Sequence, residues 1–450
     1  MSSKWNQTLM YLSQLTPHMN LNIPSPIDTT ESLVKSMPGS PSAAAPVPPQ
    51  YGCQSKQLRV YFLILYISTM LRIGDMTKAL AALTALHAAL DETRPQDTDE
   101  LQGIFRVPIH GVNDMPGSTI GIRIRWMSFS QVYCLTYLLS GICHKADLTQ
   151  PSKAQEFLVE GIKVVDREFN VNDHAPATIL IRRNQQWYSL LMMNMLLQLV
   201  DVFLLKFELA AAEDVLLRAN YWANISNMGD QFAWRIMLAT GMVLQMRGRL
   251  EDSLKWFQFC MQHSLDEVRD PDGFDAKTLA ICNTALIYCG ERFFNPAKVK
   301  QLVNVIKARY PTGLPANIQC ALHILDSWIS VGVIPARQHL QEALRLSNAL
   351  QNTQMRSLTL LLLGHVYLQS HDDQAERMLS VGFSHAVKTG NKFIASASGS
   401  CLQELYLKTA QGIKASQQAE LNKQVTEDVD KAFQSTMLAS LLEPLQLPAP

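Results

Sequence analysis

Apolar residues recur along most of this chain with the three-residue and four-residue spacing of amphipathic helices. From about residue 56 onward, apolar-periodic stretches of roughly 12 to 18 residues alternate with short polar or glycine-containing turns. Stretches that alternate at every second residue, as a half-buried strand would, are scarce. The pattern therefore predicts an all-α chain built from helical hairpins.

The predicted hairpins repeat the small, large, small spacing of the tetratricopeptide motif. Within about 34 residues, that motif places small residues where two helices touch and a large one in the gap between hairpins. The stretch WRIMLATGMVLQMRGRLEDSLKWFQFC supplies Gly241, Gly248, Ser253, Phe257 and Cys260 in this register. A bundle of unrelated hairpins would not keep restoring such a spacing, so the sequence favours a repeat array.

Other parts of the chain keep the same register. The matching positions are Ala285, Tyr288 and Ala297 in one unit, Ala336, Leu340 and Ala343 in another, and Leu363, Gly364, Tyr367, Ala375, Leu379 and Gly382 in a third. We therefore expect a solenoid of tetratricopeptide-like hairpins.

Composition divides the chain into successive parts. Residues 1–21 form a short amphipathic leader, and residues 22–50 are rich in Pro, Ser and Ala, which is typical of a disordered linker. Residues 51–415 hold the repeat array, with a loop insertion at about 93–119, and residues 416–450 form a C-terminal helix and tail. The sequence does not decide between an ordered and a flexible insertion.

Charge and hydropathy narrow the classes of partner. The chain has 39 basic and 39 acidic residues, so it lacks the net positive charge that drives non-specific nucleic-acid binding. The apolar stretch from Ser189 to Leu205 is long enough to span a membrane. However, Asn194, Gln198 and Asp201 form one stripe on that helix, which is typical of a helix packed on neighbours. We expect no membrane partner and no direct sequence-specific contact with nucleic acid.

Motifs of known catalytic, cofactor and metal sites are missing from the sequence. It contains no phosphate-binding or dinucleotide-binding glycine motif, no H-E-x-x-H and no G-x-S-x-G, and its eight cysteines include no C-x-x-C pair. His365 and His371 would lie about 120° apart on one helix, and Asp372 and Asp373 suit the N-cap of the next helix. We therefore expect no enzyme, no cofactor and no metal site.

Two stretches carry a family resemblance. LRVYFLILYISTMLRIGDMTKAL (Leu58 to Leu80) and ARQHLQEALRLSNALQNTQMRSLTLLLLGHVYLQSHD (Ala336 to Asp372) resemble the cohesin-loading-factor family. That family is the tetratricopeptide-like subunit that partners the large HEAT-repeat subunit of the cohesin loader. The resemblance extends from about Lys56 to about Ala415, and EALRLSN and Leu-Gly-His are its most specific elements.

The resemblance implies a fold and a role. It implies a right-handed superhelix that envelops the extended N-terminal segment of the large subunit, in a complex that loads cohesin onto chromatin for sister chromatid cohesion. It further implies a nuclear, chromatin-associated scaffold without catalysis, with cohesin and chromatin as indirect partners. Family members carry further helical repeats upstream of the first stretch, where this chain has a Pro-rich leader. The chain therefore resembles the C-terminal portion of the family.

Candidate recognition residues lie on the first helix of each hairpin, because that helix lines the concave face of such arrays. The positions that packing does not use are Arg235, Met242, Gln245, His365 and Leu368. We expect them to contact an extended partner segment. The alternative is another helical-repeat adaptor, such as the sensor domain of a transcriptional regulator or a signalosome-type subunit.

Overall fold

The structure, a computed structural model, describes residues 52–92, 103–108, 121–146, 151–173, 179–263, 276–310, 313–350 and 352–434. The predicted leader at 1–21, the predicted linker at 22–50 and the end of the predicted tail lie outside the described residues. The chain forms two compact units. Unit one comprises Met1–Met70 and Lys78–Tyr133, and unit two comprises Leu71–Thr77 and Cys134–Pro450.

Unit one contains most of two long helices, α2 (Gly52–Ile73) and α3 (Met76–Glu92). Their apolar residues form a buried core, in which Leu63, Ile67 and Leu86 are fully enclosed. The ring of Tyr61 on α2 meets the edge of Trp126 with centroids 4.5 Å apart, which ties α2 to the segment that precedes α5.

A two-stranded ribbon is the exception to the helical pattern. Strand β1 (Ile104–Pro108) lies inside the predicted loop insertion, and β2 (Gly121–Arg125) follows it. The two strands are antiparallel, with Ile104 opposite Arg125 and Pro108 opposite Gly121. The β2 sequence GIRIR alternates apolar and basic residues, as a strand does, but five residues give only a weak periodic signal.

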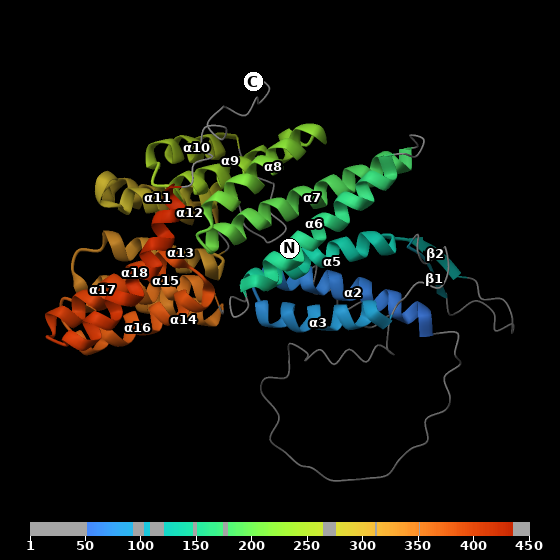
Figure 1. The fold of residues 1–450 in the computed structure, drawn as a ribbon. Coiled ribbons are helices and arrows are strands. Elements are labelled where there is room, and N and C mark those ends of the chain that lie inside the picture. The colour runs from blue at the N-terminus through green and yellow to red at the C-terminus, as the bar shows by residue number, and fades with distance from the viewer. Residues whose placement is uncertain are drawn as a thin grey trace, which may run out of the picture. The chain divides into compact units, whose positions relative to one another are not determined.

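Unit two is an array of successive helices (Figure 1). Its helices are α5 (Phe129–Ala146), which begins in unit one, α6 (Pro151–Asp173), α7 (Ile179–Leu205), α8 (Leu209–Ile225), α9 (Gly229–Met246), α10 (Leu250–His263), α11 (Ala276–Cys289), α12 (Pro296–Arg309), α13 (Ala316–Ile329), α14 (Val333–Ala349), α15 (Thr353–Tyr367), α16 (Asp372–Thr389), α17 (Lys392–Lys408) and α18 (Gly412–Gln434). Consecutive helices pack against one another as hairpins. The predicted fold class is confirmed, since the described chain is almost entirely α-helical and its helices form successive hairpins.

The α9–α10 hairpin shows why the motif needs small residues. A Cβ atom on Gly241 would lie 2.5 Å from the ring of Phe257, so only glycine allows this approach. Ser253 donates a hydrogen bond to the carbonyl of Gly241 at 2.8 Å, and Cys260 is fully buried. Gly248 has a φ of 76° in the turn, where a Cβ would be unfavourable. The predicted register of this hairpin is confirmed.

Two more predicted units keep their register. In the α15–α16 hairpin, a Cβ on Gly364 would lie 2.5 Å from Leu379, and a Cβ on Gly382 would lie 3.3 Å from Leu360. In α14, the three predicted packing residues are buried. Close approach at glycine and burial of the large residue therefore define these hairpins as they define α9–α10.

The α11–α12 hairpin departs from the predicted spacing. Ala285 is buried as expected, but Ala297 is exposed, so that prediction is wrong. The 3-10 turn η2 (Glu291–Phe293) lengthens the connection, and α12 starts only after Asn295, whose side chain accepts a hydrogen bond from a backbone N–H of the first turn. The first buried residue of α12 is consequently Val299.

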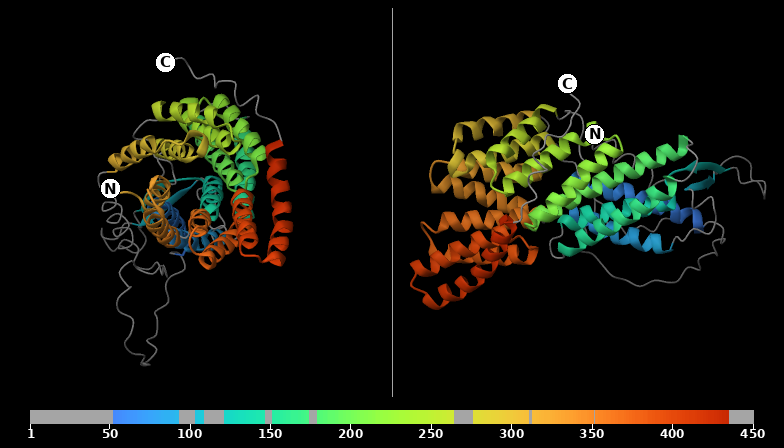
Figure 2. Two further views of the ribbon diagram at one scale, coloured as in Figure 1. Left: turned by 90° about the vertical axis from the view of Figure 1, so that its left-hand side faces the viewer. Right: turned by 45° about the horizontal axis from the view of Figure 1, so that its top comes forward.

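The last hairpin of unit two meets its second. Phe207, in the turn between α7 and α8, contacts Phe393 of α17 and Phe433 of α18, with ring centroids 5.7 and 5.5 Å apart. Helix α18 also contacts α8, and Figure 2 shows the two side by side. The array of unit two thus turns far enough for distant hairpins to touch.

Candidate functional site

The polar stripe on α7 lies against two cationic side chains from neighbouring helices. Asn194 Oδ1 accepts a hydrogen bond from Arg235 Nη1 of α9 at 2.6 Å. Gln198 Oε1 accepts one from Lys145 Nζ of α5 at 2.5 Å, and Asp201 Oδ2 lies 3.1 Å from the same nitrogen. The stripe predicted from sequence is therefore a set of buried or half-buried polar contacts between three first helices.

This arrangement accounts for the apolar composition of α7. The segment Asn184–Leu205 is long and apolar enough to cross a membrane by length and composition, but 83% of its apolar window is buried inside the structure. Its polar side chains also have protein partners. Helix α7 is a helix packed on its neighbours, as the sequence predicted.

A cavity of about 420 Å³ lies beside the polar stripe, within unit two. Its walls come mainly from the first helices of successive hairpins, α5, α7, α9, α11, α13 and α15, and from the end of α2 with the turn that follows it. Its apolar lining includes Leu71, Ile142, Leu204, Leu238, Met242 and Leu279, and its polar lining includes Arg72, Lys145, Asp201, Arg235, Tyr310, Asn317 and Gln354. A largely apolar wall with a few polar groups is typical of a binding site.

The predicted recognition residues fall into two places. Arg235 and Met242 line the cavity. Gln245 lies almost one turn beyond Met242 on α9, is half-buried, and is not among the lining residues. His365 and Leu368 lie at the end of α15, away from the lining residues. The structure therefore brings two of the five predicted residues to one cavity.

The residues at the end of α15 have other surroundings. His365 is exposed, whereas Leu368 packs against the apolar clusters between the last hairpins and accepts a hydrogen bond from Lys408 at 3.0 Å. His371 occupies the N-cap of α16, and Asp372 lies in the first helical turn and pairs with Lys408 at 2.7 Å. The prediction that the aspartates cap α16 is therefore wrong by one position, because both follow the N-cap residue. In the first turn, their negative charges interact favourably with the helix dipole.

The sequence did not single out Arg72, Lys145 and Leu279 as site residues. Arg72 closes α2, Lys145 lies on α5 and Leu279 lies on α11. These elements are far apart in sequence and meet only through the path of the array. The sequence did contain one indication of the cavity, because Asp201 belongs to the polar stripe of α7 and lines the cavity. We interpreted that stripe only as a feature of helix packing.

The cysteine side chains that the structure describes are buried or partly buried. Burial raises the pKa of the Cys134, Cys143 and Cys282 thiols to about 12, so thiolate is scarce at neutral pH. Within the described part of the chain, no group of three or more His, Cys, Asp or Glu residues is placed to hold a metal ion.

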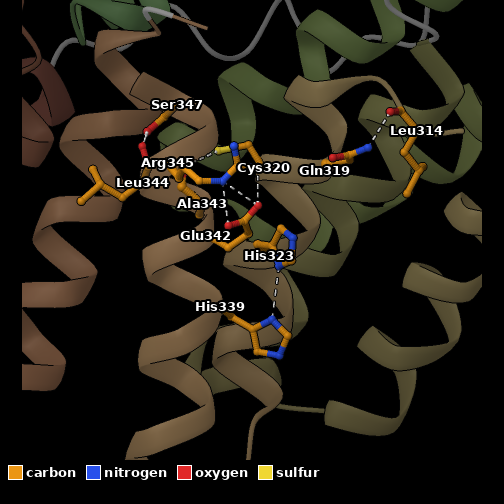
Figure 3. A network of polar contacts seen from close by, with 10 residues as sticks. All are labelled: Leu314, Gln319, Cys320, His323, His339, Glu342, Ala343, Leu344, Arg345 and Ser347. Atoms are coloured by element: carbon orange, nitrogen blue, oxygen red, sulfur yellow. Dashed lines mark hydrogen bonds and ion pairs between the residues drawn. The ribbon is translucent and has the colours of Figure 1, made fainter. Parts of the chain in front are cut away.

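A pair of histidines joins the two helices of the α13–α14 hairpin (Figure 3). His323 Nδ1 and His339 Nδ1 lie 3.2 Å apart, a distance at which one neutral ring donates to the other. Burial, and then the nearby His339, lower the pKa of His323. Glu342, one turn along α14, is held by Arg345 through a contact of 2.6 Å. This polar network lies outside the cavity lining.

Comparison with known proteins places the chain among homologues. The profile of the family described as cohesin loading factor matches residues 50–412. The MAU2 chromatid cohesion factor homolog of Drosophila persimilis is 21% identical over 334 residues, which are 70% of this chain and 47% of that protein. The homolog of Drosophila melanogaster is 20% identical over 333 residues, with 70% and 46% covered. The chain thus spans about half the length of the curated relatives it matches.

The similarity of this chain to solved structures is weaker. The Rap conjugation gene regulator of plasmid pLS20, in complex with the Phr* peptide, gives a TM-score of 0.45 at 12% identity, covering 86% of this chain and 99% of that one. A Rap protein complexed with competence and sporulation factor gives 0.44 at 8% identity, covering 84% and 99%. The family profile, in contrast, matches well over half of the chain. This chain belongs to the cohesin loading factor family.

Proposed function

We propose that this protein is a non-catalytic adaptor of the cohesin loader, and that its unit two binds the extended N-terminal segment of the large HEAT-repeat subunit. Through that complex it supports the loading of cohesin onto chromatin for sister chromatid cohesion. The observation that carries the proposal is the cavity of about 420 Å³ lined by the first helices of successive hairpins.

The geometry of the array suits an extended occupant. A peptide that runs along a helical solenoid meets one first helix after another, so each hairpin contributes a few contacts. The cavity is bordered by six such helices and offers both apolar surface and hydrogen-bonding groups. Membership in the cohesin loading factor family supports the choice of a cohesin-loader partner. We propose cohesin and chromatin as its indirect partners in the nucleus.

A cavity-filling variant with a matched control tests the proposal. Ala316 is exposed in the first turn of α13 and lines the cavity, whereas Ala297 is exposed in the first turn of α12 and does not. Titration with the N-terminal region of the large loader subunit of the same species should show binding to the wild-type chain. Ala316→Trp should weaken it by about tenfold or more, because the indole occupies the segment's space, and Ala297→Trp should not.

The outcomes separate cleanly. Folded wild-type protein that does not bind the N-terminal region of the large subunit contradicts the proposed function. Binding by Ala316→Trp with the wild-type dissociation constant places the segment elsewhere on the chain. Circular dichroism of both tryptophan variants checks that each retains its helical content.

A further inference from the structure

The charged groups around the cavity do not cancel. Asp201 is the single carboxylate among the lining residues that the structure describes, and it pairs with Lys145 at 3.1 Å. Arg235, another cation of the lining, donates a hydrogen bond to the side-chain amide oxygen of Asn194. Arg235 is also only 7% exposed, so solvent screens this charge poorly. Among the described lining residues, three side chains are cationic and one is anionic.

Arg72 is the exposed cation of this wall. It lies in the last turn of α2, in the short part of that helix that belongs to unit two. No ion pair joins it to another residue of the described chain. The positive charge of Arg72 interacts favourably with the negative C-terminal end of the helix dipole, which accounts for an arginine in the last turn of α2. Its charge nevertheless adds to that of Arg235 at the cavity.

The neighbouring surface is apolar. Leu71 and Ile73 flank Arg72, and Leu238, Met242 and Leu279 line the same cavity. An occupant that complements this wall carries one acidic group among apolar side chains. A basic segment would bring like charges together in a partly desolvated space, which is unfavourable.

We propose that the segment held in unit two places an aspartate or glutamate carboxylate against Arg72, with apolar side chains on either side of it. The inference rests on the proposed function and specifies the chemistry of the segment. A guanidinium group can bind a carboxylate through two parallel hydrogen bonds, so Arg72 contributes to selectivity as well as to affinity. The apolar neighbours exclude water around that contact.

Charge reversal on the full-length chain tests this assignment. Arg72→Glu is compared with Arg377→Glu, since Arg377 is also exposed but lies on α16, the second helix of its hairpin. The probe is the N-terminal region of the large loader subunit, titrated at low and at moderate salt. Arg72→Glu should weaken binding by about tenfold or more at low salt, and by less when salt screens the charges. Arg377→Glu should match the wild type.

A charge swap identifies the carboxylate. Each acidic residue of the probe is changed in turn to arginine, and one of these probes should bind Arg72→Glu more tightly than the unchanged probe does. Wild-type affinity of folded Arg72→Glu, or the lack of any restoring swap, overturns this inference while leaving the proposed function intact. Failure of the wild-type chain to bind the probe contradicts the proposed function itself.

Discussion

Phe207, in the turn between α7 and α8, stacks on Phe393 of α17 with ring centroids 5.7 Å apart and ring planes inclined by 24°. Phe433 of α18 meets the same ring edge-on at 5.5 Å. Phe207 is 2% exposed and has a φ of 60°, a backbone conformation that bulky residues rarely adopt. Packing of its ring therefore maintains an unfavourable backbone, and it joins the second hairpin of unit two to the last.

Removing that ring should loosen the end of the array. We expect Phe207→Ala to destabilise the contact by about 3–5 kcal/mol, the usual range for a buried phenylalanine. Because repeat arrays open locally, the effect should appear as faster amide hydrogen exchange in α17 and α18. Phe294→Ala is the control, since Phe294 is 57% exposed. Unchanged exchange in α17 and α18 of Phe207→Ala would show that this contact does not hold the array together.

Substitution by alanine should have different effects on stability at two glycines of α9, Gly241 and Gly229. At Gly241 a Cβ would lie 2.5 Å from the Phe257 ring, whereas at Gly229 it would meet nothing within 4 Å. Gly241→Ala should therefore destabilise the protein by about 1–3 kcal/mol through overpacking. Gly229→Ala should be neutral or stabilise it by up to about 1 kcal/mol, since alanine favours the helix. Urea unfolding curves of the two variants check the contrast, and equal shifts would contradict it.

The sequence predicted those parts of the fold whose constraints are local to one hairpin. Gly241 and Gly364 were recognisable because helix contact demands a small residue at a fixed distance from its large partner. The prediction for Ala297 was wrong, because an irregular 3-10 turn changes the length of the connection between α11 and α12. No periodic rule anticipates such a turn. The sequence did not predict the β1–β2 ribbon, because its strands are too short to show a clear alternation of apolar and polar residues.

The candidate site likewise contains some residues that the sequence predicted and others that it did not. Arg235 and Met242 were predicted because their positions on a first helix set the face they occupy. Arg72 and Lys145 reach the cavity from the end of α2 and from α5. Their approach depends on the curvature of the whole array, which accumulates from many small rotations between hairpins. A single sequence holds no direct signal for that curvature.

A buried ion pair connects successive hairpins. Glu213 of α8 lies 2.6 Å from Arg247, in the turn after α9, and their side chains are 0% and 2% exposed. Arg247→Met would leave a buried carboxylate without this cation, and we expect a loss of about 3–5 kcal/mol. The double variant Glu213→Leu/Arg247→Met should recover much of that loss, because both charges are then gone.

Chemical denaturation of Arg247→Met and of the double variant measures how much stability is regained when Glu213 is replaced as well. Lys163→Met is the control, since its pair with Glu160 is exposed to solvent and should contribute little. Single and double variants of equal stability would show that the Glu213 carboxylate does not need its partner.

The histidine pair of the α13–α14 hairpin should make stability depend on pH. His323 faces His339 and Glu342 of α14, Lys307 of α12, and Asp326 of its own helix. Burial and the charge of His339 lower the pKa of His323, and the two carboxylates oppose that shift only in part. The folded state therefore prefers a neutral His323.

The sign of the pH effect follows from linkage. As pH falls through the ordinary histidine value of about 6.5, the unfolded chain takes up a proton at His323 before the folded chain does, so stability decreases. Above that pH both states are neutral there, and the contribution of His323 is fully present. His323→Gln should therefore give a shallower loss of stability between neutral and mildly acidic pH, measured by urea unfolding at a series of pH values. His365→Gln, at an exposed position of α15, should keep the wild-type profile. A profile for His323→Gln as steep as that of the wild type would assign the acid sensitivity to other groups.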